Sequence, residues 1–182
     1  MNKKSNGAPL LISNSLIELG PPVLKHWQIR LKDTEFAKFC IKKARKTLFF
    51  DGATKGNPGI SGAGGVIKSA EGRIETRYAW GVGSNTSTQA EALALLQGLK
   101  VLKFLGIKDA VVFGDSQTII EAIVDNSSPS DLRLSRMLSR INSLTNSFQS
   151  LEFLHIKRDN NKEADAEANK AALLPWSSSK RW

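Results

Sequence analysis

The sequence predicts an α/β domain in which helices pack on a mixed β-sheet. Three short β-rich runs at hairpin spacing come first, and two helix–strand units follow them. Strands of a hairpin pair antiparallel, whereas strands joined by a crossover helix pair in parallel. The 182 residues are 41% apolar, enough to form a buried core. We therefore expect one folded domain, with some chain left outside it.

The first three strands are predicted at residues 47–50, 62–69 and 73–80. Residues 47–50 are β-rich and run into Asp51-Gly52, a pair that often opens a turn. The other two runs flank Ala70-Glu71-Gly72, which favours a hairpin. A glycine-rich segment precedes the second run but lacks the phosphate-loop pattern. It indicates either close strand packing or a backbone that approaches a sugar–phosphate chain.

Helices and strands alternate in the second half of the chain. A stripe of leucines predicts the first helix, and Gly106 supplies a natural stop. A second leucine-rich stripe predicts a helix after a loop of turn formers at 126–130. The helices are predicted at 87–105, 116–124, 131–146 and 162–174, and the strands at 109–113 and 151–156.

The basic charge is concentrated at the N-terminus. Residues 1–47 carry +7 of the formal net charge of +9, which points to an acidic partner such as nucleic acid. We divide the chain into a basic arm or linker at 1–45, a domain at 46–174 and a tail at 175–182. A candidate short helix follows Pro21-Pro22. It is either a docking helix with a solvated basic edge, which the pattern favours, or a phosphate-binding arm.

Composition excludes several classes of protein. The single cysteine, Cys40, rules out an internal disulfide and a multi-cysteine zinc site. The apolar runs are too short to cross a bilayer, and the N-terminus lacks the apolar region of a secretory signal. We expect no membrane partner and an intracellular protein, nuclear or cytoplasmic. An organelle transit peptide stays open because no acid precedes Glu18.

Four carboxylates occupy costly positions. Asp51 ends the first apolar strand, and Asp115 follows the apolar run 111–113 after one glycine. Glu91 and Asp165 lie at helical spacing from apolar residues, toward the buried face of their helices. Neighbouring strands would bring the first two acids together. Because clustered acids without buried bases repel one another, a divalent cation such as Mg²⁺ or Mn²⁺ would resolve the conflict.

Each acid also has a purely structural explanation. Asp51 could open a turn, and Glu91 could complete a capping box with Thr88. Asp115 and Asp165 could stabilise helix N-termini. Taken singly, these explanations are the more common ones. Taken together, one metal site accounts for all four acids, and we therefore favour it.

Four motifs resemble those of type 1 ribonuclease H, in the reverse-transcriptase-like branch found in retroelements. The first begins at Asp51 and reads DGATKGNPG, and the second, QAEA, contains Glu91. The third, GDSQ, contains Asp115, and the fourth, NKEADA, contains Asp165. Their order and spacing agree with the family across residues 46–174. The four acids fall on the positions of the family's catalytic, metal-binding carboxylates.

The resemblance implies a fold and an activity. The fold is a ribonuclease H-like five-stranded mixed sheet of order 3-2-1-4-5. The activity is endonucleolytic cleavage of the RNA strand of an RNA/DNA hybrid, leaving 5′-phosphate and 3′-hydroxyl ends. Two Mg²⁺ or Mn²⁺ ions about 4 Å apart would serve this chemistry, with Asp51 bridging them. We expect the isolated domain to be a monomer.

The resemblance also suggests contacts with the substrate. Minor-groove recognition would read the 2′-hydroxyls of the RNA strand. The matching positions for nucleic-acid contacts are Asn57, Ser87, Thr88, Gln89 and Gln117. Ser87 and Thr88 stand where many members carry asparagine, and both could instead cap a helix.

Two departures from the family pattern affect the predicted site. The loop after the last strand is short and lacks the usual histidine, so we predict that Arg158 handles the scissile phosphate. His155 lies within the strand pattern and is predicted to pack there. A basic insertion is also missing, and Arg133, Arg136 and Arg140 either replace it in part or form a solvated helix face.

Two other functions remain as alternatives to the nuclease. One is a non-catalytic ribonuclease H-like module that binds nucleic acid or a partner, although the four acids favour an enzyme. The other is a 3′–5′ exonuclease of the same superfold. It is disfavoured because such enzymes carry Asp-x-Glu on the first strand, whereas Gly52-Ala53 follow Asp51 here.

Overall fold

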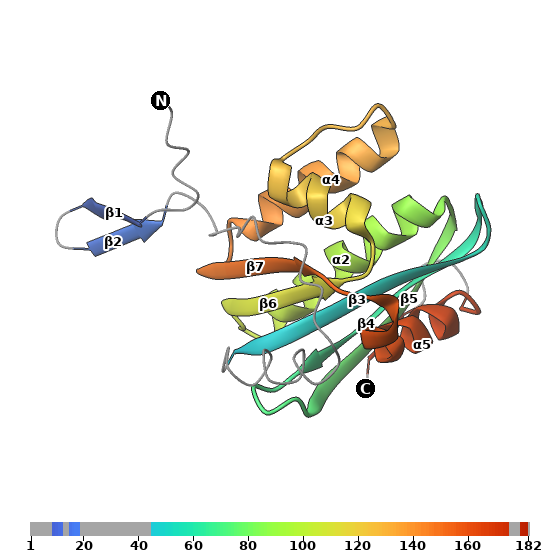
Figure 1. Cartoon of the computed structure of the whole chain (residues 1–182), viewed down its shortest axis with the longest axis horizontal. Helices are drawn as coiled ribbons and strands as arrows, with labels where there is room; N and C mark the ends of the chain where they lie inside the picture. Colours follow the sequence, from blue (N-terminus) through green and yellow to red (C-terminus); the bar gives the residue numbers. More distant parts are fainter. Residues whose placement is uncertain (1–8, 13–14, 19–44, 175–178, 182) are drawn as a thin grey trace.

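A computed structural model describes residues 9–12, 15–18, 45–174 and 179–181. Its body is one sheet of six strands with helices packed on both faces (Figure 1). The strands of this sheet are β3 (Lys46–Gly56), β4 (Gly59–Lys68), β5 (Ile74–Asn85), β6 (Asp109–Gly114), β7 (Ser150–His155) and β8 (Ser179–Arg181). The helices are α2 (Ser87–Phe104), α3 (Gln117–Asp125), α4 (Leu132–Thr145), α5 (Lys162–Ala171) and the 3₁₀ turn η1 (Arg158–Asn160).

The sheet order confirms the predicted fold. The strands lie in the order β7-β6-β3-β4-β5-β8, so the five core strands have the predicted order 3-2-1-4-5. Strands β3, β4 and β5 pair antiparallel, whereas β6 pairs in parallel with both β3 and β7. The sheet differs from the prediction by one strand. The three-residue β8, from the segment predicted as a tail, adds antiparallel to β5.

The first strand was predicted too short. We expected it to end at Asp51, but β3 continues to Gly56 and pairs residue by residue with β4 back to Gly59. The chain after Asp51 leaves the core, and its side chains lose their apolar character while the backbone ladder persists. Because the hydrophobic pattern reports burial rather than pairing, it missed this exposed half of the hairpin.

Alternate residues of β3 face two different layers. Leu48 and Phe50 belong to the larger core, which the helices α2, α3 and α4 cover. Phe49 faces the smaller core on the opposite side, which includes Ala164 of α5 (Figure 1). Helix α5 packs unusually close to β4, because a Cβ on Gly64 would lie 2.3 Å from the backbone nitrogen of Ala168. This glycine therefore permits direct contact between helix and strand backbones.

Side-chain caps fix where the helices near the site begin. Thr86 is the N-cap of α2: its side chain accepts from the Gln89 amide, and the Gln89 side chain accepts from the Thr86 amide. The capping box of Thr88 with Glu91, the structural alternative for this acid, does not form, because the N-cap of the helix is Thr86. Its consequence is functional, since Glu91 is left without a capping role.

The arm contains a hairpin that was not predicted, and the domain begins one residue before the predicted boundary. Within the arm, β1 (Pro9–Ile12) and β2 (Ser15–Glu18) form an antiparallel hairpin. Arg45, which we placed in the arm, instead belongs with the sheet: its guanidinium donates to Asp109 at 2.7 Å and to buried Glu152 at 2.8 Å. The candidate helix after the proline pair lies outside the described residues.

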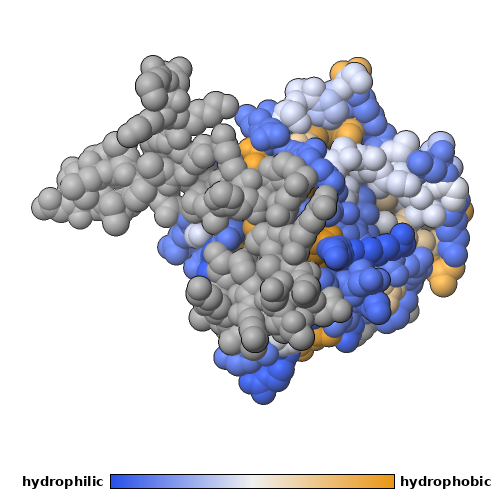
Figure 2. Space-filling model, viewed as in Figure 1, coloured by the Kyte–Doolittle hydropathy of each residue, from blue (hydrophilic) through white to orange (hydrophobic). Residues whose placement is uncertain are grey.

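The surface of the described residues offers no dominant apolar feature in the view shown. Hydrophobic residues are scattered over it and do not gather into one patch (Figure 2). Among the described residues, no helix is both long enough and apolar enough to span a membrane.

Candidate active site

The register of two parallel strands places the first pair of acids. Phe50 on β3 lies opposite Gly114 on β6, so Asp51 and Asp115 follow at adjacent positions of neighbouring strands. Asp51 is buried, and its Oδ1 accepts a hydrogen bond of 2.9 Å from the Gly52 amide. Two carboxylates thus lie side by side where the parallel pairing of β3 with β6 ends.

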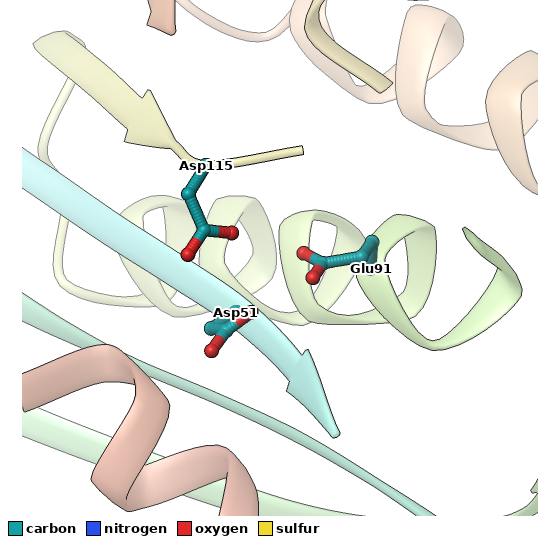
Figure 3. Close-up of side chains that lie close together, drawn as sticks. All are labelled: Asp51, Glu91 and Asp115. Atoms are coloured by element: carbon teal, nitrogen blue, oxygen red, sulfur yellow. The ribbon is translucent and has the colours of Figure 1, made fainter. Parts of the chain in front are cut away.

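Close packing of α2 brings the third acid to this pair. A Cβ on Gly52 would lie 2.4 Å from the backbone nitrogen of Glu91, so only glycine lets the helix approach β3 this far. Carboxylate oxygens of Asp51, Glu91 and Asp115 all lie within 4.8 Å of one another. Figure 3 shows the three side chains, from β3, from α2 and from the residue that follows β6, turned toward a common space.

The fourth acid comes from α5, which packs on the opposite face of the sheet from α2. Asp165 lines the same pocket as the other three acids, and Arg158 of η1 lies 3.5 Å from its Oδ1. The start of α5 is held by Asn161, a buried residue whose Nδ2 donates to the Phe50 carbonyl at 2.9 Å. The pocket has a volume of about 390 Å³ and opens to solvent past exposed Arg158.

Burial dominates the electrostatics of the cluster. It raises the pKa of Asp51 from its ordinary 3.8 to about 7, against a hydrogen bond with Glu91 that lowers it. Burial and the charge of Asp51 raise the pKa of Glu91 well above its ordinary range. Burial also raises the pKa of Asp115, which the positive charge of Arg158 opposes. The folded chain therefore holds these acids at a cost when no cation accompanies them.

The cluster fits a divalent cation. Its donors are carboxylate oxygens from three separate elements, a set that suits Mg²⁺ or Mn²⁺. The Oε2 atom of Glu91 is buried without a hydrogen-bond partner among the described residues. A buried carboxylate oxygen in that state is costly, and a bound cation would satisfy it.

The raised pKa of Asp51 predicts how stability depends on pH without metal. Between pH 3.8 and about 7 the folded state binds a proton that the unfolded state has released, so the stability contributed by protonated Asp51 is full below pH 3.8 and is lost as pH rises through about 7. In chelator, we expect the melting temperature to drop by several degrees from about pH 5 to about pH 8. Asp51→Asn should flatten this dependence, whereas exposed Asp125→Asn should not.

The same series with added Mg²⁺ provides the control. A cation paired with the ionised carboxylates favours their charged form, so the drop should shrink in the unaltered protein. An identical pH profile in Asp51→Asn and in the unaltered protein would contradict the assignment. Thermal unfolding followed by circular dichroism measures each case.

The predicted nucleic-acid contacts fall into two groups. Ser87 lines the acidic pocket, and Asn57 lies beside it, its Oδ1 accepting from the Ser87 amide at 3.0 Å. Thr88 follows in the first turn of α2 and is partly exposed. Gln89 differs, because it is buried, caps α2 and donates to Asp131 at 2.9 Å. Gln117 is exposed on α3 and donates to Glu121, outside the pocket lining.

His155 and Arg158 take different positions. His155 is half-buried at the end of β7, and its Nε2 lies 3.1 Å from the Asp115 carbonyl, to which it can only donate. Arg158 reaches the pocket from the short loop, as its predicted role requires. The sequence reasoning did not single out Asn161 or Thr54, which also shape the site. Asn161 stands within the fourth motif, and this placement was the available signal.

These features define a ribonuclease H-like domain: a core sheet of this order, with acids gathered around the point where the parallel pairing of β3 and β6 ends. Residues 49–171 match the sequence pattern of the reverse transcriptase-like family. The chain belongs to that family, as a domain of the type 1 ribonuclease H kind.

Two curated relatives carry ribonuclease H names. Ribonuclease HI of Halobacterium salinarum is 34% identical over 123 residues, which make up 68% of this chain and 62% of that protein. Ribonuclease H of a Sulfurovum species is 38% identical over 84 residues, 45% of this chain and 54% of that protein. The chain thus spans less than two thirds of the length of either relative.

Solved structures share the fold over most of their length. The crystal structure of the H. salinarum RNase H1 superposes with a TM-score of 0.67 at 34% identity, over 70% of this chain and 96% of that one. LC11-RNase H1, crystallised in complex with an RNA/DNA hybrid, gives a TM-score of 0.66 at 27% identity, with the same two coverages.

Proposed function

We propose that this protein is a metal-dependent endoribonuclease that cleaves the RNA strand of RNA/DNA hybrids. The observation that carries the proposal is the acidic pocket, where Asp51, Glu91, Asp115 and Asp165 converge from four elements beside Arg158. The named ribonucleases H among the relatives, and the hybrid bound in one similar structure, support this substrate.

The four acids would form the metal-binding set, with Asp51 central because its strand, β3, lies next to both β6 and α2. Two Mg²⁺ or Mn²⁺ ions bound there would supply activation of a water and stabilisation of the leaving 3′ oxygen, giving 5′-phosphate and 3′-hydroxyl ends. The protein's own contribution is to hold the carboxylates in place through the sheet, the Gly52 contact and the Asn161 bond.

The remaining polar groups of the pocket would position the substrate. Arg158 is exposed and cationic, which suits contact with the phosphate next to the scissile bond. Ser87 and Asn57 lie at the pocket edge, where they can meet 2′-hydroxyls and sugar oxygens in the minor groove. Gln89 would act indirectly, because its side chain fixes the start of both α2 and α4.

The test is cleavage of an end-labelled RNA/DNA hybrid with Mg²⁺ or Mn²⁺, with duplex RNA and duplex DNA as controls. We expect internal cuts in the hybrid's RNA strand alone and none in chelator. Binding of hybrid without any cleavage in either metal would instead identify a non-catalytic module.

The role of Arg158 gives a separate prediction. Arg158→Ala should lower kcat about tenfold or more while changing KM less, because the guanidinium acts near the phosphate that gains charge. Lys157→Ala is the matched control, since it removes an exposed cation one residue away. His155→Ala should act mainly through stability, by losing the contact with the Asp115 carbonyl. A larger kcat loss in a well-folded His155→Ala protein would reverse the two roles.

A further inference from the structure

A basic groove lies between the middle of β5 and the helices α2 and α4. It is open to solvent, with a volume of about 530 Å³. Arg133, Arg136 and Arg140 line it along one side of α4, and Trp80 and Met137 contribute apolar surface. Its lining, which consists entirely of described residues, includes no acidic side chain.

A second hollow continues the positive surface along the same two helices. It measures about 350 Å³, shares Arg140 with the groove and adds Lys100 and Lys103 from α2. Burial, and after it the charge of nearby Arg140, lowers the pKa of Lys100. Within the described part of the chain, no ion pair neutralises any of the five.

Three cations on or facing α5 are paired instead. Lys68, Arg77 and Lys170 each pair with a glutamate of α5. Uncompensated cations crowded on adjacent helices disfavour the free protein and favour a polyanion that neutralises them. The grooves are therefore suited to a chain of phosphates, in which negative charge repeats at short intervals.

The segment around the start of α2 lies between the groove and the acidic pocket, although the two linings share no residue. Arg133 donates to the Ser84 carbonyl at 3.2 Å, and Gln89 donates to Asp131, the N-cap of α4, at 2.9 Å. Ser87, between those two segments of chain, lines the acidic pocket. Helices α2 and α4 lie side by side on one face of the sheet (Figure 1). A strand leaving the pocket past the start of α2 would thus meet the arginines of α4.

We propose that this groove binds the sugar–phosphate backbone of one strand of the nucleic-acid substrate, beyond the site of cleavage. The proposal rests on the proposed function. From Arg133 to Arg140, α4 rises about 10 Å at 1.5 Å per residue. Backbone charges along one strand recur about every 3.4 Å of helix axis, so the arginines span roughly three nucleotides. The surface would lengthen the footprint on the substrate without entering the chemistry.

The test compares two double variants of equal charge. Arg136→Gln/Arg140→Gln removes two exposed groove cations and leaves Arg133 with its backbone contact. Arg73→Gln/Lys108→Gln removes two exposed cations at the end of the sheet away from the carboxylates. Fluorescence anisotropy with a labelled RNA/DNA hybrid, in chelator and across a salt series, gives the affinity and its salt slope. Cleavage in Mg²⁺ gives kcat and KM.

We expect the groove variant to bind hybrid about tenfold more weakly or worse, with a salt slope smaller by about two. The control variant should match the unaltered protein, and kcat at saturating hybrid should be similar in all three. Arg136→Lys/Arg140→Lys should recover most of the salt slope, because it keeps both charges. Melting temperatures check that each variant is folded.

Equal affinity and salt slope in the two glutamine variants would overturn the groove. This outcome is separable from failure of the proposed function. If the unaltered protein cleaves hybrid but the groove variant binds like the control, the groove is wrong and the nuclease stands. If no hybrid is cleaved but binding depends on Arg136 and Arg140, the groove stands and the nuclease is wrong.

Discussion

Replacing Asp51 with asparagine is expected to abolish cleavage of RNA/DNA hybrid without unfolding the protein. Asp51 is buried, and its carboxylate lies close to those of both Glu91 and Asp115. Losing this negative charge should remove several kcal/mol of metal-dependent transition-state stabilisation. The cleavage rate should therefore fall on the order of 1,000-fold. The fold should persist because an asparagine oxygen can still accept from the Gly52 amide. Asp115→Asn should behave in the same way.

Stability and activity should move in opposite directions in this variant. Removing a charge from a buried, repelling cluster should raise the melting temperature in chelator. Hybrid cleavage and thermal unfolding, measured on the same preparation, test both halves. Asp125→Asn, at the exposed end of α3, is the matched control and should change neither. Unchanged cleavage by well-folded Asp51→Asn and Asp115→Asn proteins would refute the assigned site.

Gly52→Ala is expected to damage the site through a single methyl group. The added Cβ would lie 2.4 Å from backbone atoms of Ala90 and Glu91, so strand and helix must separate. Overpacking of this kind lowers the free energy of unfolding by about 1–3 kcal/mol. Each kcal/mol lowers the melting temperature by roughly 2–4 °C. The same separation moves Glu91 away from Asp51. Because catalysis depends on placement to within about 1 Å, activity should fall on the order of 100-fold.

Gly62→Ala separates the loss of stability from the loss of geometry. Its Cβ would lie 2.2 Å from the backbone nitrogen of Ala172, an equally severe clash between β4 and α5. We expect a similar fall in melting temperature but a much smaller loss of hybrid cleavage at a temperature where both variants are folded. Equal activity losses in the two variants would show that Gly52 acts through stability alone.

The elements of the fold follow from local patterns in the sequence. The leucine stripe of α2 and the apolar run of β6 each match the period of their element, and both appear where expected. Two strand segments were predicted less well. Strand β8 and the exposed half of β3 carry no hydrophobic signal, because their pairing depends on a neighbouring strand edge.

For the candidate site, too, some features follow from local sequence and others depend on tertiary packing. The sequence by itself determined which acids are costly to bury, and the four motifs determined their family. It also determined that Arg158, not a histidine, stands in the loop beside them. Each of these is a property of a short segment, readable from residue type and spacing.

Only the tertiary structure decided how these residues meet. The register of β3 with β6 puts Asp51 beside Asp115, and the contact at Gly52 brings Glu91 within reach of both. Gln89 was predicted to contact the substrate, but in the structure it is buried and donates a hydrogen bond from α2 to Asp131, the N-cap of α4. The grooves on α4 likewise exist only because α2 lies next to it. Local sequence sets what each segment prefers, whereas distances between segments arise from packing of residues far apart in the chain.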